Sequence, residues 1–448
     1  MKSVMLLLAS GFLSSGAQAT DLFQAWEAAA GHDPQWLADQ STAKADAQFD
    51  SQARSFYLPK IGARAGIGQG NLVQNTEGAH FATPNMSSDQ VQFSTDLNNA
   101  TRQYWGVELR QPLMDAASFA MAAQLKEQAK AGASQADLRK QDAILRLADC
   151  YFGVLSSRSM LRAIEGQQQA TARALEVASA RYRNGDIPVT EKEEAAARLE
   201  LLQAQMLSVK QQVDLAEQRY MLLTGLSSVR LADLSEINEK SGLDMPDLKS
   251  AVEAARKNNP VVAMAQATAQ ASKEEVEKYR AWKSPRLELV AQAGEDRWKA
   301  GVGMQNSRQS YVGLELNVPI FTGGYRSAKL EESLARSEAS EGHLSQVENS
   351  AEDLVRSSWL AVKQGFSRVK ALKLARSATS RQLDATRLGH EEGARTLLDV
   401  LNVQQTAATI DSELDRARYE TALSWLRVHS AIGDLSIEQL AKLNALMK

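Results

Sequence analysis

The chain has 448 residues, of which 44% are apolar and 23% charged, and its formal net charge is −3. This composition excludes an intrinsically disordered chain, and the length suffices for two or three domains. Because there is no basic excess, nucleic-acid binding has no support. The one cysteine, Cys150, has no partner for a disulfide, and we expect a small apolar helix residue there.

Residues 1–19 have the features of a secretory signal peptide. Lys2 precedes an apolar run from Val4 to Leu13, and Ala17-Gln18-Ala19 forms a cleavage site of the A-x-A type. We therefore expect a mature chain that begins near Thr20. No later run of roughly 18 or more apolar residues predicts a membrane-spanning helix. An exported protein can still cross a membrane through strands that close into a barrel.

Two tandem copies of one pattern, residues 20–226 and 247–433, make up most of the chain. Corresponding glycines lie 208 residues apart, and a strand-like motif recurs 207 residues later, but the start of the pattern recurs only after 226 residues. The matching pairs are Gly185 and Gly393, Gly225 and Gly433, residues 106–113 and 313–320, and residues 33–34 and 259–260. The first copy thus carries about 19 additional residues, which fall in the polar stretch 70–102. Its Asn, Thr, Ser, Gln and Gly content predicts a loop.

Each copy begins with a helical segment followed by two strand-like runs. In these runs apolar and polar residues alternate, which is typical of strands with one buried face. The runs are long enough to cross a bilayer when tilted. The predicted helical segments are about 21–56 and 247–282, and the predicted strands are about 58–69, 103–113, 286–294 and 310–320.

A proline-free long helix and a shorter return helix close each copy. The long helices are predicted at about 116–184 and 326–391, and the return helices at about 189–223 and 396–430. At about 1.5 Å per residue, each long helix measures roughly 100 Å, which no ordinary globular domain needs. Apolar residues in the return helices step alternately by four and three, from Ala195 to Tyr220 and from Val403 to Ala417. This spacing predicts coiled-coil packing.

Four strands in one chain cannot close a barrel, and open strand edges in lipid leave unpaired backbone groups. The sequence therefore favours an α+β membrane protein in which several chains share one barrel. Three chains would supply twelve strands.

Beside this plan, two motifs resemble the TolC family of outer-membrane efflux and secretion ducts: Pro-Ile-Phe-Thr-Gly-Gly at 319–324 and Gly-Ala-Arg-Thr-Leu-Leu-Asp-Val-Leu at 393–401. The resemblance covers nearly all of the mature chain. It implies a homotrimer with a 12-stranded β-barrel in the outer membrane of a Gram-negative-type cell, in contact with outer-membrane lipid. A periplasmic α-helical coiled-coil tunnel would continue the barrel. The linker 227–246 and the tail 434–448 would form an equatorial girdle around it.

The resemblance also implies a function, namely the exit duct of a tripartite export system. Its partners would be a periplasmic adaptor, or membrane fusion protein, and an inner-membrane ABC or proton-driven transporter. The cargo would be secreted protein, small toxic compounds or both, and the first helix is more similar to members that serve type I protein secretion. No cofactor, metal site or enzymatic activity is expected, because the five histidines are scattered and no hydrolase or phosphate-binding motif occurs.

Carried over residue by residue, the resemblance implies a gate at the periplasmic end of the tunnel. Asp399 corresponds to an aspartate whose ring narrows that end. Arg395 corresponds to an arginine that ties the inner helix pair to its neighbour, with Thr190 and Glu191 at the receiving positions.

Two gate positions depart from the family pattern. Asn402 stands where a second aspartate ring is usual, and His390 stands where a tyrosine bonds across the closed gate. The helix-tip turns, which in the family meet the adaptor, depart as well, because a small apolar residue usually precedes the glycine. The tip residues are Asn184, Gly185, Glu392 and Gly393.

Simpler interpretations remain open. Asp399 can be a charge that stabilises a helix N-terminus, and Arg395 and Glu191 can be exposed charges with nothing measurable between them. For the whole chain, a soluble periplasmic coiled-coil scaffold explains the helices but leaves the strands without a purpose. A general porin explains the strands but not the helices.

Overall fold

A computed structural model of the chain describes residues 19–227, 230–238 and 241–447. The predicted signal peptide lies outside the described residues except for Ala19. The chain forms two compact units. Of the described residues, one unit comprises those within 19–44, 133–265 and 344–447, and the other comprises residues 45–132 and 266–343. Among the described residues, no helix combines the length and the apolar character needed to cross a bilayer.

The helical segment that opens each copy is divided at a proline. The first is not one helix over 21–56 but three: α1 (Leu22–His32), α2 (Pro34–Asp46) and α3 (Gln48–Ser55). The second consists of α6 (Leu248–Asn258) and α7 (Pro260–Ala281). Proline has no N–H for the preceding helix but suits the first position of the next. The Asp33-Pro34 and Asn259-Pro260 pairs therefore mark corresponding breaks.

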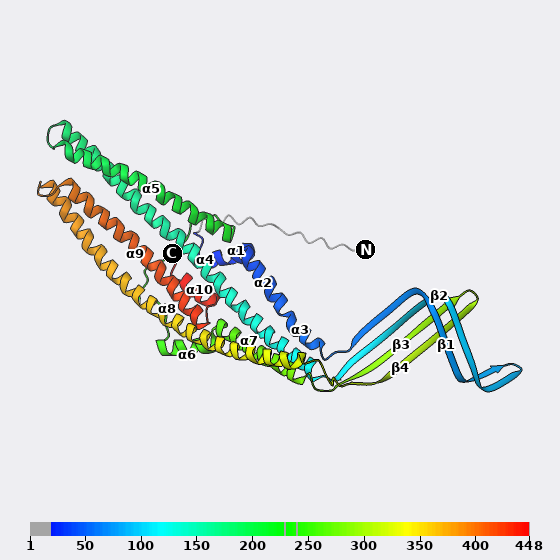
Figure 1. Cartoon of the computed structure of the whole chain (residues 1–448). Coiled ribbons are helices and arrows are strands. Elements are labelled where there is room, and N and C mark those ends of the chain that lie inside the picture. Colours follow the sequence, from blue (N-terminus) through cyan, green and yellow to red (C-terminus); the bar gives the residue numbers. More distant parts are fainter. Residues whose placement is uncertain (1–18, 228–229, 239–240, 448) are drawn as a thin grey trace, which may run out of the picture. The chain divides into compact units, whose positions relative to one another are not determined.

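Four antiparallel strands form one sheet in the order β1 (Lys60–Thr83), β2 (Met86–Met114), β3 (Arg286–Ala300) and β4 (Gly303–Asn317) (Figure 1). The prediction that the last strand reaches Ile320 is wrong. Pro319 cannot donate a hydrogen bond to a neighbouring strand, and β4 ends two residues before it.

The prediction of a loop over residues 70–102 is also wrong. β1 and β2 continue through this stretch as a paired ribbon that ends in a turn at Pro84 and Asn85. Backbone pairing between two strands needs no apolar side chains, so the polar composition could not reveal it. Three register shifts interrupt the ladder, between Gly70 and Leu72, Thr76 and Ala79, and Ala79 and Phe81.

The four-stranded part of the sheet has an apolar face and a polar face. The apolar face carries exposed side chains, among them Ile61 (69% exposed), Ile67 (72%) and Val312 (74%). The polar face carries an ion-pair network in which Arg110 meets carboxylates from three strands, Glu108, Glu288 and Glu315. Further along the same face, Arg102 holds Asp296 with two nitrogens. The predicted alternation of apolar and polar residues is therefore confirmed in these strands.

Two helical hairpins follow the strands: α4 (Ala116–Arg183) with α5 (Val189–Thr224), and α8 (Tyr325–Glu391) with α9 (Leu397–Ile432). Their bounds lie within two residues of the predicted ones. The return helices end at Gly225 and Gly433, which adopt the left-handed conformation with φ of 69° and 91°. In α5 the residues buried along the predicted seam are Ala195, Leu202, Val209, Val213 and Tyr220.

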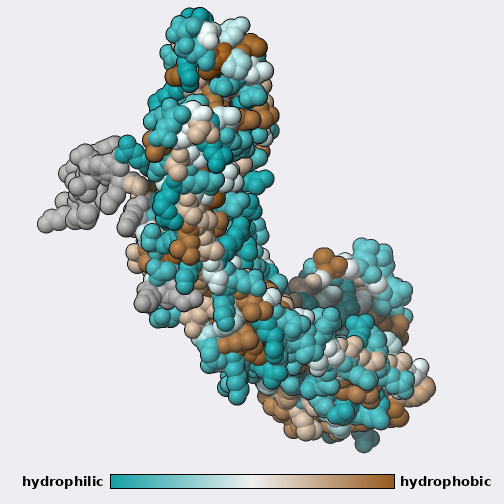
Figure 2. Space-filling model, turned by 90° about the vertical axis from the view of Figure 1, so that its left-hand side faces the viewer, coloured by the Kyte–Doolittle hydropathy of each residue, from teal (hydrophilic) through white to brown (hydrophobic). Residues whose placement is uncertain are grey.

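The main hydrophobic core lies in the unit that contains both hairpins. It is built around Trp425 and gathers residues of α1, α4, α5, α9 and the short helix α10 (Ile437–Asn444), which lies in the tail. Its largest fully buried members are Leu22, Ile144, Leu147, Tyr151, Phe152, Tyr220, Ile237, Trp425, Leu426, Leu440 and Leu443. Figure 2 shows that on the outer surface of the helices hydrophobic residues form separate groups among hydrophilic ones.

The linker between the two copies has no helix or ladder strand in its described residues, yet it is held firmly. Leu231 bridges Thr20, and Leu234 bridges Met447. The Tyr151 hydroxyl lies 2.8 Å from the carbonyl oxygens of Thr20 and Ala232 and donates to this pair. Burial raises the pKa of Tyr151, so that the hydroxyl keeps its proton.

Candidate gating site

The two hairpins lie side by side and end in similar turns (Figure 1). Gly185 and Gly393 have φ of 83° and 77°, and a left-handed residue at these points lets the chain leave one helix and enter the next. Asn184 and Glu392, directly before the glycines, are exposed. The tips therefore present polar side chains and free space, since a Cβ on either glycine would meet no atom within 4 Å.

The first turn of α9 is fixed by a capping box. The Thr396 hydroxyl oxygen accepts from the Asp399 N–H at 3.1 Å, and the Asp399 carboxylate accepts from the Thr396 N–H at 3.1 Å. The Thr396 N–H and then its hydroxyl hold the pKa of Asp399 below its usual value, and Arg395 adds a smaller electrostatic effect. Asp399 is thus an ionised helix-start residue at neutral pH, as the simpler interpretation expects.

The start of α5 is built differently. Its N-cap is Pro188, which makes no side-chain capping bond, and Glu191 is the acidic residue of the first turn. Thr190 is exposed. The two copies therefore share the glycine turn but not the cap, which leaves Thr190 and Glu191 available for other contacts.

A cavity of about 240 Å³ brings the two tips together. Glu191 of α5 and His390 of α8 both line it, with Arg181, Ile187 and Leu397. The His390 Nδ1 donates to the Arg395 carbonyl oxygen at 3.0 Å, which folds the α8–α9 turn onto the end of α8. The structure thus places His390 beside the receiving hairpin.

Arg395 does not reach its predicted partners within one chain. Its side chain lies against its own hairpin, where a Cβ on Gly389 would come within 3.1 Å of the Arg395 Cγ. Within the described part of the chain, its guanidinium has no hydrogen bond or ion pair to Thr190 or Glu191. A link between these residues therefore requires a different state of the hairpins or a neighbouring copy.

A different arginine joins the two hairpins. Arg198 of α5 donates from Nη1 to the Asn402 Oδ1 of α9 at 2.9 Å, and from Nη2 to the Gln405 Oε1. Asn402 is therefore a hydrogen-bond acceptor in a link between helices. An aspartate at this position would offer Arg198 a charged partner instead of a neutral one.

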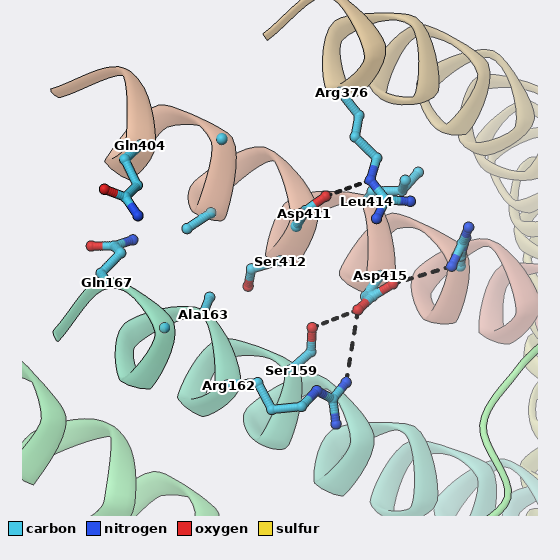
Figure 3. A pocket seen from close by; sticks show the side chains of 14 residues that line it. Ser159, Arg162, Ala163, Gln167, Arg376, Gln404, Asp411, Ser412, Leu414 and Asp415 are labelled. Atoms are coloured by element: carbon cyan, nitrogen blue, oxygen red, sulfur yellow. Dashed lines mark hydrogen bonds and ion pairs between the residues drawn. The ribbon is translucent and has the colours of Figure 1, made fainter. Parts of the chain in front are cut away.

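Further along the hairpins, a polar seam runs between α4, α8 and α9 (Figure 3). The Asp415 carboxylate accepts from the Ser159 hydroxyl at 2.6 Å and lies 3.9 Å from Arg162. One turn earlier, Asp411 pairs with Arg376 at 2.6 Å. These residues line a cavity of about 500 Å³, across which Gln167 and Gln404 face each other in Figure 3.

Sequence reasoning missed Arg198 and this polar seam. The apolar spacing of α9 identified its buried stripe, and Asp411 and Asp415, four residues apart, flank that stripe. Their spacing shows that they share a helix face, but it does not show which helix lies opposite. The partner residues 159, 162, 198 and 376 are distant in sequence and carry no motif.

The two hairpins are thus joined near their tips by the hydrogen bonds of Arg198, and further along by the contacts of Asp415 with Ser159 and Arg162. Each such pair contributes only about 0 to 1 kcal/mol. These contacts are directional and individually weak, and their residues lie outside the main hydrophobic core.

The sequence pattern of the family described as "Outer membrane efflux protein" matches residues 37–226 and 251–434. The chain is 27% identical to the outer membrane protein TolC of Escherichia coli, over 97% of this chain and 86% of that protein. It is 26% identical to the proteases secretion protein PrtF of Dickeya chrysanthemi, over 99% and 95%. Among solved structures, the Campylobacter jejuni CmeC outer membrane channel has the same fold, with a TM-score of 0.76 at 14% identity over 96% of this chain and 90% of that one.

Proposed function

The chain belongs to the outer membrane efflux protein family and is an outer-membrane exit duct for efflux or secretion, and from this premise we propose how its copies form and gate one conduit. The family consists of transport channels rather than known enzymes. The protein resides in the outer membrane with a periplasmic extension. Its cargo is secreted protein, small toxic compounds or both.

Three copies form one barrel in this proposal. In the four-stranded sheet β1 and β4 are the outer strands, so each has an edge that pairs with no strand of the same chain. Pairing β4 of one copy with β1 of the next satisfies these edges and yields twelve strands. The apolar face, with Ile61, Ile67 and Val312 exposed in the single chain, then contacts lipid, and the polar face lines the lumen. This exposed apolar face is the observation that carries the proposal.

The two hairpins of each copy form a periplasmic tunnel with those of its neighbours. The linker and the tail surround it as a girdle, consistent with their attachment to the hairpin core through Tyr151 and Trp425. At the tunnel end, the exposed tips at 184–185 and 392–393 dock a periplasmic adaptor. That adaptor connects the duct to an inner-membrane ABC or proton-driven transporter.

The gate closes by links between hairpins. Within one copy, Arg198 holds Asn402 and Gln405. Between copies, Arg395 reaches Thr190 and Glu191 of the next hairpin, a partner that its own chain does not offer. Three Asp399 carboxylates then ring the narrow entrance, and their mutual repulsion and attraction for cations follow from like charges brought together.

A soluble periplasmic coiled-coil scaffold is the alternative, and it is not favoured. It gives no role to a sheet with one exposed apolar face and two open edges. The test is fractionation of cells, followed by mass measurement of the detergent-extracted protein. We expect a trimer in the outer-membrane fraction. A monomer in the soluble periplasmic fraction would contradict the duct.

A further inference from the structure

The β1–β2 ribbon, residues 71–99, extends well beyond the rest of the sheet. The β3–β4 turn at Ala300–Gly303 lies level with Thr101, which pairs with Lys299. From Leu72 to Thr83 the ribbon measures roughly 40 Å at the usual rise of a strand. Among the residues that the structure describes, no other strand pairs with it, and its side chains are largely exposed.

A bend is built into the base of this ribbon. The pairing register between β1 and β2 shifts between Gly70 and Leu72, which forms a bulge. Opposite this bulge, Asn99 has a positive φ of 53°. The Asn99 N–H donates to the Asn71 side-chain oxygen at 2.8 Å. Asparagine tolerates the left-handed conformation better than most residues, and bulges bend a strand and increase its twist. Figure 1 shows the ribbon turning sharply where β3 and β4 end.

The contacts at the bend show which face the ribbon turns toward. The Gln305 amide of β4 donates to the Gln74 side chain of the ribbon, although β4 is three strands away from β1. Gln305 pairs with Trp298, and a Cβ on Gly70 would lie 3.5 Å from that indole. Residues paired across a ladder share a face, so Gln305 and Trp298 lie on the same side.

That side is the polar face. Trp298 pairs with Arg102, the residue that holds Asp296, and the Arg102 guanidinium stacks over the Trp298 ring at 5.3 Å. Leu97 packs there too, since its Cδ2 lies 2.9 Å from a Cβ placed on Gly303. The ribbon therefore crosses over the outer end of the polar face and away from the apolar face.

We propose that the β1–β2 ribbon is a lid over the outer mouth of the duct. This inference rests on the proposed function, in which the polar face lines the lumen. With three copies, three ribbons bend inward and narrow the exit. Small solutes pass between them, whereas a large cargo must push them aside. Because the Gln74–Gln305 contact is a single hydrogen bond between neutral amides, it gives way without disturbing the ladder below.

The test measures access from outside the cell to a cysteine inside the lumen. Gln309 is exposed on the polar face and pairs with Gly294, deeper than the ribbon contact. In a Cys150→Ala background, Gln309→Cys is treated on intact cells with a small maleimide and with a polyethylene-glycol maleimide of several kilodaltons. The comparison variant replaces residues 72–98 by an Asn-Gly turn. The positive control is Ser88→Cys, which is exposed near the ribbon tip.

With the full ribbon we expect the small reagent to label Gln309→Cys and the large one to fail. With the shortened ribbon we expect both to label it. Equal labelling by the large reagent in both variants would overturn the lid. Loss of all labelling at Ser88→Cys, in an assembled outer-membrane trimer, would instead contradict the proposed orientation of the duct. A second variant, Gln74→Ala with Gln305→Ala, keeps the ribbon and is expected to admit the large reagent in part.

Discussion

Arg198 of α5 donates a 2.9 Å hydrogen bond to Asn402 of α9, so the residue that replaces a second acidic ring in this chain joins the two hairpins of one copy. In the proposed trimer, a neutral amide in this position accepts from arginine without bringing three further negative charges to the tunnel entrance. In that proposal, asparagine rather than aspartate at position 402 determines both the link between the hairpins and the charge of the entrance.

Replacing Arg198 by Ala should loosen the closed gate. The pair is exposed and contributes about 0 to 1 kcal/mol, but three symmetric copies bias a two-state tunnel by up to about 3 kcal/mol, roughly a hundredfold in open population. We expect intact trimers with raised conductance in planar bilayers. Lys210→Ala, an exposed substitution further along α5, is the control and should conduct like the parent. Unchanged conductance of Arg198→Ala would remove this link from the gate.

Arg395→Ser, and Glu191→Ala combined with Thr190→Val, test the proposed link between copies. Arginine offers a planar set of donors, and the carboxylate and hydroxyl offer matching acceptors. Both variants should assemble, conduct more in planar bilayers and make cells permeable to large antibiotics. If both behave like the parent, His390, which lines the same cavity as Glu191, becomes the better candidate.

Asp399→Ala should abolish block of the channel by multivalent cations. Only one acidic ring is expected at the entrance, because Asn402 is neutral, so Asn402→Ala should leave the block nearly unchanged. Single-channel recordings with a trivalent cation on the periplasmic side measure both effects. Block that survives in Asp399→Ala would place the cation site elsewhere.

The block should also depend on pH in a defined direction. The capping box lowers the pKa of Asp399 in the folded chain. The charged carboxylate, and the stability that it gives to α9, are therefore fully present above the usual pKa of an aspartate. The charge and the stability are lost as pH falls through the pKa of Asp399 in the folded chain. We expect block to persist from neutral pH down through the usual aspartate range and to vanish only at lower pH, where Asp399 becomes protonated. Block that weakens already well above the usual aspartate range would contradict Asp399 as the residue that binds the cation.

An epitope inserted between Pro84 and Asn85, in the turn of the ribbon, should be tolerated and should be labelled on intact cells. Exposed turns accept insertions because few contacts are lost. An unlabelled epitope in a folded trimer would indicate that the sheet faces the opposite side of the membrane.

The sequence predicted the parts of the fold that depend on local pattern. The long helices contain no proline, their ends carry glycine, and the seam from Ala195 to Tyr220 keeps a regular spacing. The ribbon could not be predicted, because its strands are polar and are stabilised by pairing with each other. In the candidate site, Asp399 and its helix start were found from a sequence motif, whereas Arg198 was not. Its partners lie about 200 residues away, and only the packing of two hairpins brings them together.

Thr20 and Met447 are both held by one short segment, since Thr20 bridges Leu231 and Met447 bridges Leu234. The Ser235 N–H donates to the Leu446 carbonyl at 2.8 Å, and the Ala232 N–H donates to the Thr20 carbonyl at 3.0 Å. A mechanical load applied to either point is therefore passed first to backbone hydrogen bonds of the same short segment.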